Sequence, residues 1–168
     1  MKFEPTASRV WKTLTRDARL EAATSFFREP SQETIGLALA ALVRVRRMRP
    51  QAARALSPEE QARTLAGLLD PGEPLSSSLL VALHLGSRRP MLATFLDAAS
   101  LPHEDGLLKE EADAVTLTEE NVKAGLQALA AAHPPAAVKT YLNTLWLQDP
   151  ERWAALETLP DPEDAART

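Results

Sequence analysis

The sequence predicts an all-α fold, either a single compact irregular helical bundle or a short stack of helical hairpins, with about seven to nine helices. Alanine and leucine, two strong helix formers, supply most of an apolar content of 45%, whereas the aromatic residues that favour strands make up 5%. Capping residues or prolines precede most apolar stretches, and no stretch of useful length alternates between apolar and polar residues. Helices are therefore expected throughout the chain.

The clearest helix start is the Ser-Pro-Glu-Glu segment at Ser57. Ser57 is placed to cap the helix, the proline takes the first position, and Glu60 completes a capping box. Thr15, Ser31 and Thr118 are placed as N-caps of other helices. The expected helices cover residues 15–28, 31–48, 57–70, 77–86, 90–99, 118–133 and 134–148, with shorter ones at 8–14, at 107–114 and after Asp149.

Two further stretches indicate how these helices are arranged. Residues 35–43 are apolar on every side of a helix, so we expect this helix to lie at the centre of the fold. Residues 71–78 are rich in Pro, Gly and Ser, which is typical of a loop. We expect this segment to be the longest exposed loop and to act as a hinge between helices.

The length of 168 residues predicts one domain, over residues 1–160, followed by a disordered acidic tail at 161–168. The net charge of -4 is unevenly distributed. Residues 1–102 carry 14 Lys and Arg against 10 Asp and Glu, whereas residues 103–168 carry 5 against 13. Such asymmetry can steer a charged partner or place complementary surfaces against each other in a homodimer.

Several classes of function lack their usual motifs. The chain has no cysteine, no paired-histidine metal motif, no phosphate-binding glycine loop and no nucleophile elbow, so we predict no metal and no cofactor. No apolar stretch approaches the roughly 18 residues of a membrane span. Residues 1–12 lack the apolar core of a secretory signal, which together with the missing cysteines favours a cytoplasmic protein that does not enter membranes.

One candidate site is a pocket for a small anionic ligand or a substrate. His103 and the two carboxylates after it could transfer protons, His84 shares a helix face with Arg88, and Arg89 stands at a helix start that favours anions. The alternative is structural, because a proline, acidic residues and a glycine are ordinary turn residues and a histidine on an apolar helix usually packs in a core. The residues of this candidate pocket are His84, Arg88, Arg89, His103, Glu104 and Asp105.

A second candidate site is a basic patch on and after the helix at 31–48. Arginine binds phosphate through two parallel hydrogen bonds, so such a cluster suits nucleic-acid contact. Against this stand the acidic pI of 5.4 and the lack of interleaved aromatic residues. The alternative is a solvated helix end that pairs with acids of the C-terminal half. The basic patch consists of Arg44, Arg46, Arg47, Arg49 and Arg54.

The aromatic residues near the C-terminus indicate either a buried helix or a surface for a second chain. Trp146 lies between two leucines that point in different directions on a helix, and Trp153 follows in the next segment. Since no catalytic motif was found, the sequence favours a non-catalytic protein–protein interaction or scaffold domain that associates with a protein partner or with itself. The alternatives are an enzyme or ligand binder using the candidate pocket, and nucleic-acid binding through the basic patch.

Overall fold

The structure, a computed structural model, describes residues 1–29 and 32–165. Helices account for 71% of it, and the only strands among the described residues are two of two residues each, so the predicted all-α fold class is confirmed. Contacts divide the chain into two compact units. We call Thr6–Ser87 the N-terminal unit, and Met1–Pro5 together with Arg88–Thr168 the C-terminal unit. Each is described by itself.

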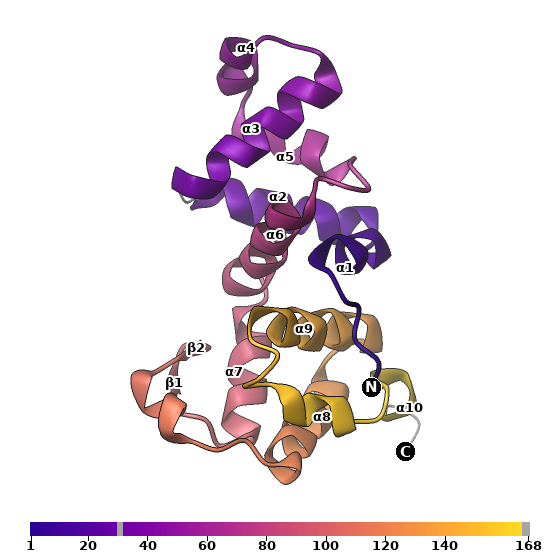
Figure 1. The fold of residues 1–168 in the computed structure, drawn as a ribbon, viewed down its shortest axis with the longest axis vertical. Coiled ribbons are helices and arrows are strands. Elements are labelled where there is room, and N and C mark those ends of the chain that lie inside the picture. Colours follow the sequence, from indigo (N-terminus) through magenta and orange to yellow (C-terminus); the bar gives the residue numbers. More distant parts are fainter. Residues whose placement is uncertain (30–31, 166–168) are drawn as a thin grey trace. The chain divides into compact units, whose positions relative to one another are not determined.

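Where the structure describes it, the N-terminal unit forms six helices, labelled α1 to α6 in Figure 1. They are α1 (Ala7–Thr13), α2 (Arg16–Arg28), α3 (Gln32–Arg46), α4 (Pro50–Ala55), α5 (Pro58–Ala66) and α6 (Glu73–Gly86). Helix α2 packs against α5 and α6 to form most of the core, α1 packs on α6, and α3 touches α4, α5 and α6. The largest fully buried side chains are those of Trp11, Leu42, Leu65, Leu75, Leu79, Leu80 and Leu83.

Helix α1 is joined to α6 through the carboxylate of Glu73. Its two oxygens accept hydrogen bonds from the backbone N–H groups of Ala7, at 2.6 Å, and Ser8, at 2.9 Å. These N–H groups have no partner within α1, and the positive end of the helix dipole favours a carboxylate there. Burial raises the pKa of Glu73, but the hydrogen bonds that its carboxylate accepts, led by those from the N–H groups of Ser8 and Ala7, together lower this pKa by a larger amount. The pKa of Glu73 therefore lies below its ordinary value.

The C-terminal unit begins with helix α7 (Arg89–Ala98) and contains the two short strands (Figure 1). The further elements are β1 (His103–Glu104), β2 (Leu107–Leu108), a 3-10 helix η1 (Glu110–Ala114), α8 (Glu119–Ala132), α9 (Pro135–Gln148), a 3-10 helix η2 (Ala154–Thr158) and α10 (Pro162–Ala165). Strands β1 and β2 pair antiparallel, with His103 opposite Leu108. Helix α7 packs on α8, which also contacts α9 and η2.

Phe95 of α7 lies at the centre of the C-terminal unit. Its ring centroid lies 5.6 Å from that of Tyr141 in an edge-to-face arrangement and 6.0 Å from that of Trp153. Gly125 of α8 lies against the same ring, since a Cβ atom at this glycine would come within 2.5 Å of Phe95 Cε2. Burial in this cluster raises the pKa of the Tyr141 hydroxyl.

The first five residues belong to the C-terminal unit rather than to the helix that follows them. The ring of Phe3 stacks on Trp146, with centroids 5.2 Å apart and an interplanar angle of 7°. The backbone N–H of Glu4 donates a hydrogen bond of 2.8 Å to Asn143 Oδ1. Both partners lie on α9, so the start of the chain is bound to one of its last long helices.

Local capping signals located three helix starts correctly. The predicted N-caps Thr15, Ser57 and Thr118 are confirmed, and Ser57 forms the expected capping box with Glu60. The predicted cap at Ser31 lies outside the described residues. Helix α3 ends at Arg46, two residues before the predicted end, because the next residue takes a left-handed conformation with a φ of 52°.

The prediction that residues 35–43 form the centre of the fold is wrong. Only Ala38, Ala41 and Leu42 of this stretch are buried, and Leu37 is 42% exposed. The core of the N-terminal unit is built instead by α2 with α5 and α6, so α3 covers one side and keeps part of its apolar surface in solvent.

The loop predicted at 71–78 is wrong, because this segment is helical from Glu73 onward. Pro74 fits the first turn of α6, and Glu73 is held by α1. The helix predicted at 107–114 is confirmed only for residues 110–114, which form the 3-10 helix η1. Its first two residues form strand β2, because the turn at Asp105 and Gly106 directs the chain back along β1.

The sequence predicts one domain, whereas the contacts form two compact units. The structure divides residues 1–160 between the two units, and the single domain over this range stays a prediction. Within the stretch 161–168, expected to be a disordered tail, Pro162–Ala165 form α10, and Asp161 pairs with Lys139 at 2.7 Å. Residues 166–168 lie outside the described residues.

Glu73→Gln is expected to lower the free energy of unfolding at pH 7 by about 1 kcal/mol, because a charged helix-capping interaction is lost. A carboxyl with a lowered pKa stabilises the fold above its unfolded pKa of about 4.3 and loses this contribution as the pH falls through the folded value. The difference between wild type and variant in urea unfolding should therefore shrink at low pH. Glu29→Gln, an exposed carboxylate, serves as control. A difference that persists undiminished in acid would contradict the assignment.

Gly125→Ala and Gly36→Ala are expected to change stability in opposite directions. A Cβ at Gly125 would overlap the Phe95 ring, which should cost about 1 to 3 kcal/mol, whereas a Cβ at Gly36 in the middle of α3 meets nothing within 4 Å. Gly36→Ala should gain up to about 1 kcal/mol from helix propensity alone. Thermal unfolding of the two variants measures both effects, and a stabilised Gly125→Ala would refute the close packing.

Candidate functional site

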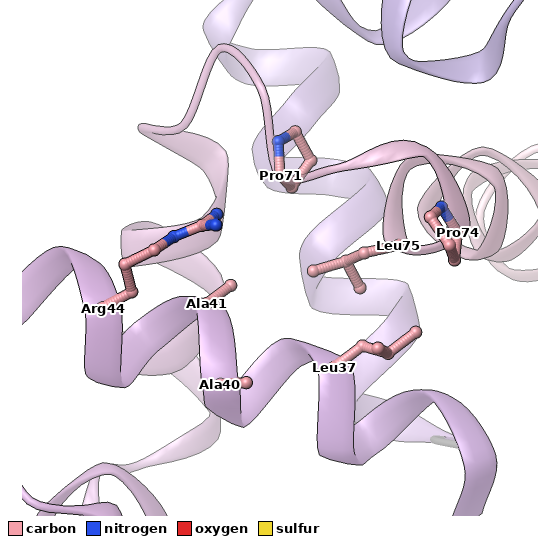
Figure 2. Close-up of a pocket in the computed structure, with 7 residues that line it drawn as sticks. All are labelled: Leu37, Ala40, Ala41, Arg44, Pro71, Pro74 and Leu75. Carbon is pink, nitrogen blue, oxygen red and sulfur yellow. The ribbon is translucent and has the colours of Figure 1, made fainter.

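The N-terminal unit has an open pocket between α3 and the start of α6, with a volume of about 270 Å³. Figure 2 shows four residues in a row along α3, and the other three lie across from them. We call it the α3 pocket. Its lining residues are Leu37, Ala40, Ala41 and Arg44 from α3, and Pro71, Pro74 and Leu75 from the opposite side.

The spacing of residues on α3 creates this pocket. Residues 37, 40, 41 and 44 are three or four apart, so they lie on one face of the helix. The two alanines in the middle of this row have short side chains, and they leave space that larger residues would fill. Leu37 remains 42% exposed at one end of the row, and the guanidinium of Arg44 stands at the other (Figure 2). The pocket is thus apolar with one positive charge at its rim.

The five arginines of the basic patch are all exposed. In the part of the chain that the structure describes, none of the five forms an ion pair. Arg44 and Arg46 lie on the last turns of α3, Arg49 precedes α4, and Arg54 lies in its last turn. Arg44 belongs both to the patch and to the α3 pocket. The expected pairing of this patch with acids of the C-terminal half stays a prediction.

The residues of the candidate ligand pocket fall into both units. His84 is buried on α6 of the N-terminal unit, and the other five residues belong to the C-terminal unit. A pocket shared by His84 and His103 therefore stays a prediction.

Within the C-terminal unit, the hydrogen bonds of His103 shape a turn. His103 Nδ1 accepts a hydrogen bond of 3.2 Å from the backbone N–H of Gly106. The proton of the neutral ring is then on Nε2, which lies 2.9 Å from Asp97 Oδ1 on α7. One nitrogen of the imidazole therefore holds the turn, and the other links β1 to α7.

The acidic turn after His103 is also held against α7. Asp105 and Gly106 have φ angles of 49° and 79°, as required for both central residues of a tight two-residue hairpin turn. Asp105 pairs with Arg89 at a distance of 3.1 Å, and Glu104 lies 3.9 Å from Lys109. We call residues 103–108 the hairpin. These charged groups thus have structural partners, which agrees with the turn interpretation of the sequence.

The hairpin presents two leucines that the sequence did not single out. Leu107 is 44% exposed and Leu108 is 38% exposed, although they are adjacent in β2. Glu110 and Glu111 follow after Lys109 and are exposed, and neither forms an ion pair among the described residues. The sequence shows two apolar residues followed by three charged ones, but it predicts a helix in this segment, so it gave no sign that both leucines are exposed.

The candidate interface at Trp146 and Trp153 is largely covered by its own chain. Trp153 is buried beside Phe95, and the guanidinium of Arg152 lies 5.8 Å from its ring centroid. Trp146 is half-buried, is stacked on Phe3, and donates a hydrogen bond of 3.0 Å to Glu157 Oε1. Both indoles therefore contribute to the packing of the C-terminal unit.

Among residues 1–29 and 32–165, no group of three or more His, Asp or Glu side chains is placed to hold a metal ion. Over the same residues, none of the helices has both the length and the apolar character needed to cross a membrane.

No protein-family model, curated protein or solved structure matches this chain. The chemistry of the surfaces described above is therefore what indicates a function. Two of them stand out from the rest of the described surface: the α3 pocket with its neighbouring arginines, and the exposed leucines of the hairpin.

Proposed function

We propose that the protein is a non-catalytic protein–protein interaction module and that its N-terminal unit binds a partner through the α3 pocket. One observation carries this proposal. Helix α3 has the composition of a buried helix, yet Leu37 and Ala40 of its apolar stretch are exposed beside an open pocket. Apolar surface gains free energy when it is removed from water, so an exposed apolar pocket favours a partner with an apolar side chain.

The charges around the α3 pocket indicate the chemistry of that partner. Arg44 stands at the rim and has no acidic partner among the described residues, and three further exposed arginines follow within five residues. Arginine binds carboxylates through two parallel hydrogen bonds. A segment that combines a leucine-sized anchor with nearby Asp or Glu residues therefore complements both the pocket and its rim.

Ala40→Glu is expected to block the pocket without harming the fold. Ala40 is exposed on α3, and a glutamate there stands four residues before Arg44, where it can form an ion pair along the helix. Random peptides displayed on phage would be selected on the wild-type protein. Enriched peptides should combine Leu, Ile or Met with Asp or Glu, and fluorescence polarisation should show binding to Ala40→Glu weakened at least about tenfold.

Ala52→Glu provides the matched control for this experiment. Ala52 is also an exposed helical alanine of the N-terminal unit, but it does not line the pocket. The enriched peptides should bind this variant as they bind the wild type. Equal affinity for both glutamate variants would show that the α3 pocket is not the binding site.

A second candidate function is nucleic-acid binding through the basic patch. The observation in its favour is that five exposed arginines form no ion pair among the described residues. Unpaired arginines on a convex helix end can contact phosphates without any pocket.

Nucleic-acid binding predicts an affinity for labelled duplex or single-stranded DNA that falls steeply with salt. Replacing Arg46 and Arg47 by Gln should reduce the slope of log K against log salt by up to about 1.8, because two phosphate contacts are lost. The matched control replaces Arg16 and Arg28, which are exposed on α2, by Gln. No binding at low salt, or equal effects of the two double variants, would exclude the basic patch.

A further inference from the structure

The hairpin offers the chemistry that the α3 pocket requires. Leu107 and Leu108 project two aliphatic side chains into solvent, at 44% and 38% exposure. Glu110 and Glu111 follow after Lys109, and among the described residues neither carboxylate forms an ion pair. In the part of the chain that the structure describes, the large exposed aliphatic residues outside the hairpin all lie in the N-terminal unit. The chain therefore carries both an apolar pocket with arginines and an apolar projection with carboxylates.

The net charges of the two units reinforce this complementarity. The N-terminal unit has 11 Lys and Arg against 8 Asp and Glu, and the C-terminal unit has 8 against 15. Opposite net charges attract the basic unit of one copy to the acidic unit of another before any contact forms. Two N-terminal units, or two C-terminal units, repel each other by the same rule.

We propose that the occupant of the α3 pocket is the hairpin of a second copy of this chain. This inference rests on the proposed function, since it names the partner of the same pocket. A leucine of β2 enters the space between Ala40 and Leu75, and Glu110 or Glu111 approaches the arginines at the rim.

The hairpin is held in place before binding, which reduces the entropic cost of association. His103 links β1 to Asp97 of α7, and Asp105 pairs with Arg89 at the start of the same helix. Gly106 lies against α7 itself, since a Cβ there would come within 2.9 Å of Leu92 Cβ. A projection fixed in this way loses little freedom when it docks.

The proposed contact joins two different surfaces, so it is heterologous. After a first contact, one copy keeps a free pocket and the other keeps a free hairpin, and association continues until a ring closes or an open chain forms. The weight-average mass in solution should then rise with protein concentration above that of a monomer. Added salt should weaken the association, because exposed charges contribute to it.

Two variants of the full chain test the inference by analytical ultracentrifugation. Ala40→Glu closes the pocket and keeps the hairpin, whereas a double variant with Leu107→Ser and Leu108→Ser removes the anchors and keeps the pocket. Each variant alone should stay monomeric at concentrations where the wild type associates, with association at least about tenfold weaker. Unchanged circular dichroism and melting temperature establish that both variants are folded.

An equimolar mixture of the two variants gives the decisive result. The intact pocket of the leucine variant should bind the intact hairpin of Ala40→Glu, and the mixture should form a one-to-one dimer that grows no further. Ala52→Glu and Leu69→Ser, which change an exposed alanine and the most exposed leucine outside both surfaces, should associate like the wild type.

Three results would overturn the inference: a wild type that is monomeric at every concentration, a leucine variant that associates like the wild type, or a mixture that stays monomeric. Failure of the proposed function is separately recognisable. If the selected peptides lose affinity for Ala40→Glu while the wild type is monomeric, the pocket binds another protein and only the self-association is refuted. If Ala40→Glu affects neither peptides nor mass, both proposals are refuted.

Discussion

In each unit, one close contact between two helices depends on a glycine. Gly86 of α6 lies so close to α2 that a Cβ there would come within 2.6 Å of Ser25 Cβ, and Gly125 of α8 lies directly on the ring of Phe95. Packing at this density is typical of protein interiors, where one added methyl group displaces its neighbours. These glycines therefore fix which helices form each core and which helix remains at the side.

Part of the apolar surface of helix α3 remains unburied in this arrangement. Once α2, α5 and α6 have formed the core, α3 buries little more than Ala38, Ala41 and Leu42. Alanine buries little apolar area, so the helix gains only part of the free energy that its composition offers. The apolar surface that stays exposed belongs to Leu37 and the α3 pocket, and a partner can bury it.

The sequence predicted features that depend on neighbouring residues, and it missed features that depend on contacts between distant segments. The caps Ser57 and Thr118 were predictable because a capping side chain bonds backbone within three residues of itself. The role of Glu73 was not predictable from its neighbours, which indicate a loop, since its partners lie some 65 residues away on α1. The α3 pocket was missed for a similar reason. The spacing of residues 37, 40, 41 and 44 is visible in the sequence, but their exposure depends on how α2 packs.

The membership of the first residues in the C-terminal unit has a consequence for biosynthesis. Residues 6–87 form an uninterrupted segment, so the N-terminal unit has all its parts once this segment has left the ribosome. Phe3 is made before any of them, yet its partner Trp146 is made near the end of translation. Phe3 therefore lacks its partner while the N-terminal unit folds. Nascent chains that stop before α9 would leave Phe3 accessible to proteases and chaperones.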